Sequence, residues 1–578
     1  MSTAFHATPA RTRRTRSSHP IDTTLRKVFG LKQLRPGQLE VIERVLQGTN
    51  TLAVLPTGAG KSLCYQLPAL LLPGTTVVVS PLVALMKDQC DALRALGVAA
   101  VQINSAIASE ELAQARAAID SGSARIVLTT PEQIADPALT TALARHPVSL
   151  LVVDEAHCIS EWGHDFRPAF LDIAPAVRAL GAPAVLALTA TAKPSVMAEI
   201  TAQLGIAAQD VVQAGAYRPN LRFAVEPLAR AADRMPRALA FVAAHEGTGI
   251  VYTATVKCAE ELHAKLADAG ESVGLYHGRL PAAERTQAQD AFMAGSTRVM
   301  VATNAFGLGI DKPDIRFVLH YQMPASVDAY YQEAGRAGRD GRDATCALLY
   351  VPQDRALQSF FLSGRYPSLG ELQAVMALLQ RPAPTGGWTA DAIVEAVDRP
   401  RAKVLVALSL LRSHKAVRRT RAGRFNGVRA LDDAALEALL AGYRARREQD
   451  GATLEAMVAY AQSGRCRWQG VLAALGESSA DSCGHCDNCQ RLADLARLTP
   501  LLENQQPIAL PASSAAPAKP RFAGGDTVRA KRYGAGQVVE ADQNSVTVEF
   551  PNGERRTFLP EFVRVARPAK VAAISAHG

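Results

Sequence analysis

The segment TLAVLPTGAGKS, residues 51–62, decides the fold of this chain. Its first residues are apolar and predict a short buried strand, which breaks at Pro56 into a glycine-bearing loop. The loop ends at Lys61 and Ser62, and LCYQL (63–67) then predicts the first turns of a helix. Backbone N–H groups in such a loop converge at the positive end of the helix, where phosphate binds well. The segment therefore predicts a nucleotide phosphate site.

Two side chains at the end of the loop have the chemistry of such a site. Lys61 supplies a charge for the β- and γ-phosphates, and the Ser62 hydroxyl can ligate Mg²⁺. The strict phosphate-loop pattern has glycine in place of Leu55, and Gly-Lys-Ser also occurs in ordinary turns. The Gln38 amide can donate and accept as an adenine edge requires, although a solvent-facing loop glutamine fits equally. We expect ATP to contact Arg35, Gln38, Pro56, Thr57, Gly58, Ala59, Gly60, Lys61 and Ser62.

The length and composition of the chain limit the kinds of protein it can be. A chain of 578 residues favours about three to five domains. Lys+Arg 63 against Asp+Glu 54 gives a net charge of +9, which suits a polyanionic partner and equally a mildly basic soluble enzyme. No apolar run reaches the roughly 18 residues that a membrane span needs, so we expect no membrane partner.

The N-terminus and the cysteines indicate the compartment. Residues 1–21 carry four arginines and no apolar block, so we expect a disordered basic arm, not a secretory signal. An organelle transit peptide fits less well because the stretch lacks an apolar face. The nine cysteines, an odd number with four clustered late, favour a reducing compartment and a metal site over a disulfide framework.

Short apolar, β-branched runs alternate with helical stretches in residues 22–212, which predicts a mostly parallel sheet covered on both faces. Asp154 and Glu155 directly follow one such run, where two acids are costly unless a cation or substrate needs them. We expect Asp154 to hold Mg²⁺ and Glu155 to deprotonate the attacking water. Solvated acids at a strand-end turn are the alternative. The predicted strands are 51–55, 75–80, 125–130, 149–153 and 184–188.

A second alternating series in residues 213–352 predicts another parallel-sheet lobe, without a phosphate loop of its own. One ATP would then lie between two lobes that open and close. Arg336 and Arg339, three residues apart, share a face of a helical turn. The predicted strands are 249–252, 273–276, 298–303, 315–319 and 345–350.

Together, the motifs SPL (80–82), MKDQ (86–89), DEAH (154–157) and TAT (189–191) resemble those of superfamily 2 helicases. The run AHCISEWGHDFRP (156–168) resembles the aromatic-rich loop of the RecQ family of DNA helicases. The resemblance implies that this loop senses single-stranded DNA and couples it to ATP hydrolysis. Base stacking on aromatic faces is worth roughly 1–3 kcal/mol per base, although core packing is the ordinary fate of such rings. The expected coupling residues are Trp162, His164, Phe166 and Arg167.

The resemblance covers about residues 25–352 and 443–490 and implies an ATP-dependent DNA helicase with RecA-like lobes. Its arginine element matches residues 332–339, which makes Arg339 the first candidate and Arg336 the second to neutralise transition-state charge; an exposed basic helix end is the alternative. The resemblance also implies 3′-to-5′ unwinding of single-stranded and branched duplex DNA in recombination and repair. It implies a cytoplasmic, nucleoid-associated location for a prokaryotic source and leaves nuclear or organellar placement open. An RNA helicase or remodeller, and a DNA-anchored scaffold with a vestigial ATPase, are the rival interpretations.

Four late cysteines predict a metal centre within residues 443–490. Four thiolates suit tetrahedral Zn²⁺ in a closed structural site, with no open position for catalysis. Their spacing matches the zinc module of the RecQ family, and redox switching is the weaker alternative. The expected ligands are Cys466, Cys483, Cys486 and Cys489.

Residues 367–430 predict three helices followed by a basic hairpin, which resembles a winged helix placed before the cysteines. The hairpin tip would contact phosphates or wedge base pairs apart through Phe425, while a basic turn on a helical spacer fits as well. Residues 499–521 predict a linker. Short strands in 522–566 predict a small SH3-like or Tudor-like β-barrel that contacts a partner protein, such as RNA polymerase, or nucleic acid.

Overall fold

The first parallel sheet is built around the strand that leads into the phosphate loop. In this computed structural model β1 (Thr51–Val54) lies between β6 (Ala184–Thr189) and β7 (Val211–Gln213), and the strand order is β3-β4-β2-β5-β6-β1-β7. Every pairing in the sheet is parallel. The other strands are β2 (Thr75–Val79), β3 (Ala100–Ile103), β4 (Ile126–Thr129) and β5 (Val148–Val153).

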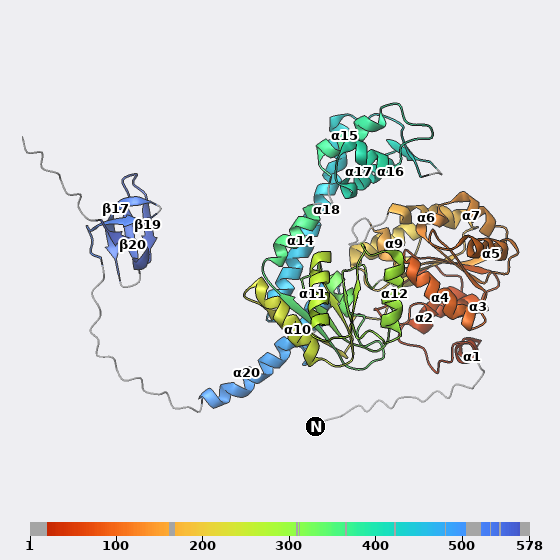
Figure 1. The fold of residues 1–578 in the computed structure, drawn as a ribbon, viewed down its shortest axis with the longest axis horizontal. Coiled ribbons are helices and arrows are strands. Elements are labelled where there is room, and N and C mark those ends of the chain that lie inside the picture. The colour runs from red at the N-terminus through yellow and green to blue at the C-terminus, as the bar shows by residue number, and fades with distance from the viewer. Residues whose placement is uncertain are drawn as a thin grey trace, which may run out of the picture. The chain divides into compact units, whose positions relative to one another are not determined.

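The structure describes residues 20–566 except 161–167, 308–309, 311, 364–366, 421–422, 480, 504–521, 532 and 543–544. The chain divides into two compact units, Met1–Asp494 and Leu495–Gly578 (Figure 1).

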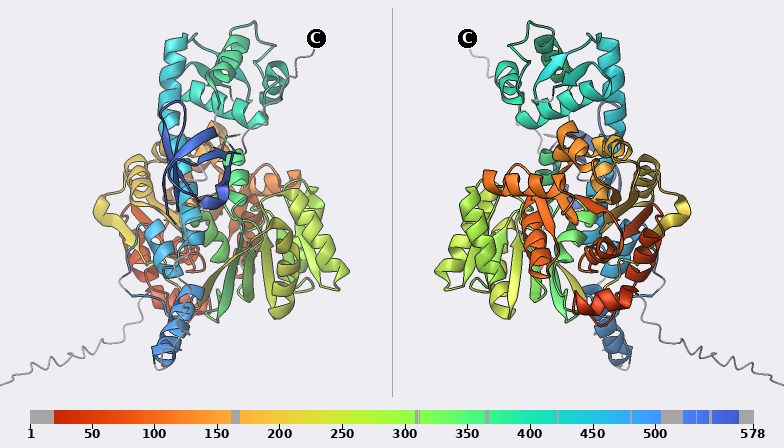
Figure 2. Two further views of the ribbon diagram at one scale, coloured as in Figure 1. Left: turned by 90° about the vertical axis from the view of Figure 1, so that its left-hand side faces the viewer. Right: turned by 90° about the vertical axis from the view of Figure 1, so that its right-hand side faces the viewer.

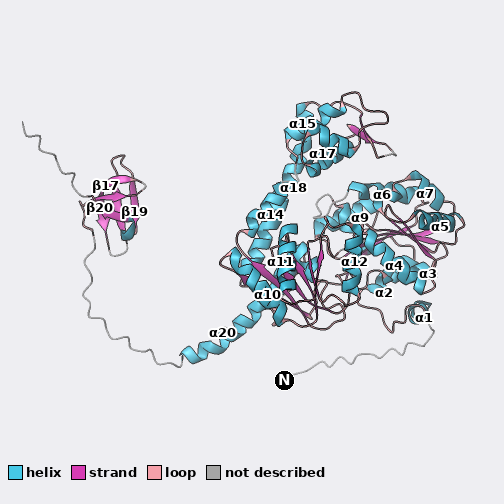
Figure 3. Ribbon diagram, viewed as in Figure 1, coloured by secondary structure: helices cyan, strands magenta, loops and turns pink. Residues whose placement is uncertain are grey.

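Helices cover both faces of the first sheet (Figure 3). One face packs on α2 (Gln38–Leu46), α3 (Leu63–Leu71) and α4 (Val83–Ala95). The other face packs on α5 (Ser109–Asp120), α6 (Pro131–Ile134), α7 (Pro137–Leu143), α8 (Ile173–Ala179) and α9 (Pro194–Leu204). Helix α1 (Pro20–Lys27) packs against α3. Two 3₁₀ helices, η1 (Ala156–Ile159) and η2 (Pro168–Asp172), flank the undescribed segment 161–167.

The second lobe is another parallel sheet, with strand order β10-β11-β9-β12-β13-β8. Its strands are β8 (Leu221–Pro227), β9 (Thr248–Tyr252), β10 (Val273–Tyr276), β11 (Val299–Ala302), β12 (Ile315–His320) and β13 (Ala344–Tyr350). Helices α10 (Arg234–Ala244) and α11 (Val256–Asp268) cover one face. The other face packs on α12 (Ala282–Met293), α13 (Val327–Ala334) and the cysteine-bearing helical region, all in one hydrophobic core.

A small helical insert follows α14 (Asp354–Ser363). It contains α15 (Leu369–Leu379), α16 (Ala390–Val397), α17 (Arg401–Ser413) and an antiparallel hairpin of β14 (Val417–Arg419) and β15 (Phe425–Gly427). Helix α18 (Asp433–Gln462) runs from this insert along the second lobe (Figure 2). Phe425 is only 9% exposed and pairs with Trp388, so the prediction that it wedges base pairs apart is wrong.

The cysteine-bearing region continues with α19 (Arg467–Ala474) and α20 (Asp487–Glu503). The C-terminal unit holds a five-stranded antiparallel sheet, β16 (Thr527–Ala530), β17 (Gly534–Ala541), β18 (Val546–Glu549), β19 (Arg555–Phe558) and β20 (Val563–Val565). The predicted fold class is confirmed in these terms: two parallel α/β lobes, a helical region with four cysteines and a C-terminal antiparallel sheet. Within the described part of the chain, no helix is both long and apolar enough to cross a bilayer.

Candidate active site and metal centre

The phosphate loop joins β1 to α3 through two glycines in the left-handed region, Gly58 (φ 83°) and Gly60 (φ 76°). A Cβ on Gly60 would lie 2.7 Å from the Gln38 side-chain nitrogen, so a side chain at this position would collide with its neighbour. The Ala59 N–H donates to the Pro56 carbonyl at 2.9 Å and closes the turn. Glycine is therefore required here both for backbone conformation and for space.

Gln38 and Arg35 hold this loop from the start of α2. The Gln38 Nε2 donates to the carbonyls of Ala59 (3.0 Å) and Gly60 (2.9 Å), while its Oε1 accepts from the Arg35 N–H at 2.7 Å. The Arg35 guanidinium donates to the Gly58 carbonyl. Both polar atoms of the Gln38 side chain are thus engaged by the backbone, and its contact with adenine stays a prediction.

The two acids lie at the carboxyl end of β5, facing the loop. Asp154 is buried, and its Oδ2 accepts from the Ser80 hydroxyl at 3.1 Å. Burial and then the neighbouring Glu155 raise the pKa of Asp154 to about 6, against the opposing charge of Lys61. Carboxylate and hydroxyl oxygens are ligands that Mg²⁺ prefers, so Asp154 and Ser62 fit that ion. Lys61, Asp154 and Glu155 therefore belong to one site.

Asp154→Asn should stabilise the nucleotide-free protein near neutral pH. Because the folded pKa is raised, the folded state binds the proton more tightly, and stability falls as pH rises from about 4 to 6. The amide removes this cost, by on the order of 1–3 kcal/mol at pH 7.5. Thermal melts without nucleotide or Mg²⁺ should show a higher melting temperature for the variant at pH 7.5. The difference should shrink toward pH 5, and an equal difference at both values would contradict the argument.

A buried polar chain leads from Glu155 to the second lobe. His157 Nδ1 is hydrogen-bonded to Thr189 Oγ1 at 3.0 Å, and it approaches Glu155 Oε2 to 3.3 Å without a hydrogen bond between them. The Thr189 hydroxyl donates to the Thr191 carbonyl at 2.9 Å, so it accepts from His157, whose Nδ1 carries the proton. The Thr191 hydroxyl in turn accepts from Gln332 of α13 at 3.5 Å.

The two candidate arginines have different surroundings. Arg339 lies directly beside the phosphate loop, because a Cβ built on Gly58 would be 3.0 Å from its Cγ. Arg336 is buried within the second lobe, where its guanidinium donates to the Gly307 carbonyl. The structure therefore brings Arg339, and not Arg336, to the loop that carries Lys61.

Sequence reasoning missed the residues that join the lobes. Arg218 donates to the Thr57 carbonyl of the loop at 3.3 Å, and to the carbonyls of Gly335 (2.6 Å) and Gly338 (2.7 Å) in the second lobe. Lys193 and Asp328 form an ion pair across the lobes at 3.0 Å. These side chains stand singly in the sequence, outside any motif, so only the folded geometry indicates their importance.

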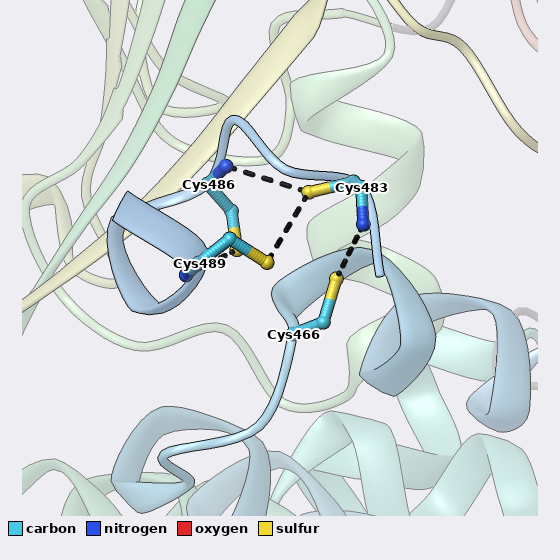
Figure 4. A group of neighbouring side chains, drawn as sticks. All are labelled: Cys466, Cys483, Cys486 and Cys489. Carbon is cyan, nitrogen blue, oxygen red and sulfur yellow. Dashed lines mark hydrogen bonds between the residues drawn. The ribbon is translucent and has the colours of Figure 1, made fainter. Parts of the chain in front are cut away.

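The four predicted zinc ligands come together (Figure 4). Their sulfur atoms all lie within 4.8 Å of one another. Backbone N–H groups donate to the sulfurs, from Cys483 to Cys466 (3.3 Å), from Cys486 to Cys483 (3.4 Å), and from Arg467 to Cys486 (3.3 Å). Such donors stabilise thiolates and orient metal ligands. Four converging cysteines with this support fit a structural Zn²⁺.

The metal centre is packed onto the second lobe. Trp468, fully buried, donates from its indole N–H to the Leu221 carbonyl of β8 at 3.1 Å. Asp487 accepts from the Val225 N–H of the same strand at 3.0 Å and pairs with Arg467. The Glu477 carboxylate accepts from Ala216, between the lobes, at 3.0 Å. This region therefore contributes to the hydrophobic core of the second lobe and to the connection between the lobes.

The predicted DNA-coupling residues, Trp162, His164, Phe166 and Arg167, lie outside the described residues. Their flanking elements η1 and η2 are placed on the same lobe as the phosphate loop.

Three family descriptions match successive parts of the chain. Residues 35–200 match the DEAD/DEAH box helicase family, 232–341 the helicase conserved C-terminal domain and 431–490 the RecQ zinc-binding domain. Among solved structures, the DUF1998 helicase MrfA bound to DNA is similar in fold, with a TM-score of 0.50 at 19% identity over 72% of this chain and 64% of that chain. The fold and these matches define a protein with the two lobes of the DEAD/DEAH box helicase class.

Curated relatives narrow the class to one family. ATP-dependent DNA helicase RecQ of Bacillus subtilis is 44% identical over 346 residues, which are 60% of this chain and 58% of that protein. The probable ATP-dependent DNA helicase RecS of the same organism is 39% identical over 62% of this chain and 73% of its own length. RecQ of Pasteurella multocida is 39% identical over 57% of this chain and 52% of its own length. The chain belongs to the RecQ family, and it spans little more than half the length of the two RecQ relatives.

Proposed function

We propose that this protein is an ATP-dependent DNA helicase that moves 3′ to 5′ and unwinds branched duplexes in recombination and repair. The observation that carries the proposal is the position of Arg339 beside Gly58 of the phosphate loop. A nucleotide in this loop would have its phosphates held by one lobe and met by an arginine of the other. Closure of the lobes on ATP, and their release after hydrolysis, would drive stepping along a strand.

The chemistry follows from the side chains around the loop. Lys61 would neutralise the β- and γ-phosphates, while Ser62 and Asp154 would hold Mg²⁺, which bridges phosphate oxygens and offsets their charge. Glu155 would orient the attacking water and accept its proton. Arg339 would stabilise the charge that develops on the transferred phosphoryl group, with Arg336 positioning its own loop through Gly307.

Coupling to DNA would use the polar chain from Glu155 through His157 and Thr189 to Gln332. We assign the sensing of single-stranded DNA to Trp162, His164, Phe166 and Arg167, which follow η1 in the sequence. The C-terminal sheet would serve a protein partner.

The test compares DNA duplexes with 3′ and 5′ overhangs. Only the 3′-tailed duplex should be unwound, and Glu155→Gln should reduce ATP turnover by about 10²–10⁴-fold because it removes the general base. DNA binding by this variant should stay near that of the parent. Stimulation of ATP turnover by RNA as strongly as by single-stranded DNA would favour an RNA helicase. Turnover at background in the parent protein would favour a scaffold with a vestigial ATPase.

A further inference from the structure

The insert at residues 367–430 lies between the matched family segments, which end at 341 and resume at 431. It holds eleven Lys and Arg against four Asp and Glu, and so carries a charge of +7 out of the chain's +9. Residues 414–431 hold six of these cations and no acid. The positive charge of this protein is therefore concentrated on one small helical domain, and within it on the hairpin.

Cations elsewhere in the insert have structural partners. Lys403 pairs with Glu371 at 3.0 Å, and Arg401 pairs with Asp391. Arg424 donates to the Gly387 carbonyl at 3.1 Å and ties the hairpin to the loop before α16. These contacts, together with the Trp388–Phe425 bridge, fix the hairpin on the domain core.

Four other cations at the hairpin have no acidic partner in the described part of the chain, although Arg429 donates to the His414 carbonyl at 3.3 Å and the Arg419 guanidinium lies 5.9 Å from the centre of the Phe425 ring. Lys415, Arg418, Arg419 and Arg429 are all exposed, and among the described residues none of them pairs with a carboxylate. Lys415 lies in the turn before β14, Arg418 and Arg419 lie on β14, and Arg429 follows β15 beside Ala416. We call these four residues the hairpin cations. Such a concentration of like charge at the surface attracts polyanions.

An ion pair joins the insert to the first lobe. Arg412 of α17 lies 3.1 Å from Asp172, the last residue of η2. Asp172 follows the proposed DNA-coupling residue Arg167 by five positions in the sequence. On its other side, the insert leads directly into α18, a helix of 30 residues and about 45 Å that extends to the metal centre.

We propose that the hairpin cations bind the phosphate backbone of duplex DNA, as a second DNA site beside the translocation site. The hairpin suits a duplex better than a single strand, because Phe425 is buried and no described aromatic side chain is exposed on the hairpin for base stacking. Four exposed cations without acidic partners among the described residues instead fit regularly spaced phosphates, without sequence readout. The inference rests on the proposed function, because the insert would bind the duplex arm of the branched DNA substrate.

The test measures binding of a blunt duplex without nucleotide, so it does not depend on helicase activity. Replacing all four hairpin cations with serine should weaken duplex binding by at least about tenfold near 100 mM salt. The slope of log affinity against log salt should fall by about 3–4, because each phosphate contact contributes about 0.9. ATP turnover at saturating single-stranded DNA should match the parent.

The matched control replaces four exposed cations of the second lobe, Arg222, Arg230, Lys257 and Lys265, each of which pairs with an acid. Equal duplex affinities for the two variants would overturn the proposal, as would an equal loss for single-stranded DNA. If the quadruple variant loses affinity for double-stranded RNA to the same extent, the partner would not be DNA specifically, and the proposal in its present form would be overturned. If the quadruple variant melts below the parent, the pair Arg418→Gln and Arg419→Gln should still lower the salt slope by about 2. If the parent protein fails to unwind DNA, but the quadruple variant still binds duplex DNA more weakly than the parent, the result would count against the helicase proposal alone.

Discussion

Arg339→Ala should lower ATP turnover at saturating single-stranded DNA by about 10³-fold or more, while nucleotide affinity changes only a few-fold. The reason is that Arg339 reaches the phosphate loop from the opposite lobe, where it would meet charge that develops only in the transition state. Steady-state turnover and the affinity for a fluorescent nucleotide separate the two effects. Arg339→Lys should recover little, because an ammonium group lacks the planar fork of donors.

Arg336→Ala is the matched control for this variant. Arg336 is buried and donates to the Gly307 carbonyl of its own lobe, so its loss should lower the melting temperature as well as turnover. Arg339 is half-buried at the lobe boundary, so its loss should leave the melting temperature near that of the parent. Turnover by Arg339→Ala within tenfold of the parent would contradict the assignment of the transition-state arginine.

The sequence predicted every strand inside the two parallel sheets, and of their edge strands it predicted β10. Central strands of a parallel sheet are covered on both faces and form continuous apolar runs, which the sequence shows directly. The strands that were missed, β3, β7 and β8, are all at sheet edges. In β8, exposed Arg222 alternates with buried Leu221 and Phe223, so this strand lacks the continuous apolar run that marks the central strands.

The residues of the site likewise divide into those that the sequence predicted and those that it did not. Lys61, Asp154 and Arg339 stand in contiguous motifs whose spacing indicates their chemistry, and the structure places them around one loop. Arg218 and the pair Lys193–Asp328 are single residues far apart in the sequence. Their importance comes from the meeting of two lobes, which local patterns do not contain.

Removal of zinc should destabilise more than the cysteine-bearing region. Trp468 and Asp487 bind the edge strand β8, and the region shares one hydrophobic core with the second lobe. Structural zinc in small zinc-finger peptides contributes about 10–16 kcal/mol at pH 7, so a strong chelator should sharply lower the melting temperature. With Trp162 and Trp388 replaced by phenylalanine, emission from buried Trp468 should shift to the red as its site opens.

Nucleotide binding, unlike DNA-stimulated ATP turnover, should survive the removal of zinc. The phosphate loop belongs to the first lobe, which has hydrophobic cores of its own, so ATP should still bind after chelation. DNA-stimulated turnover should be lost, because Glu477 no longer holds Ala216 between the lobes. Cys486→Ser should reproduce the effect of the chelator, whereas Cys258→Ser, outside the cluster, should not. An unchanged melting temperature and unchanged Trp468 emission after complete zinc removal would show that the metal does not stabilise the second lobe.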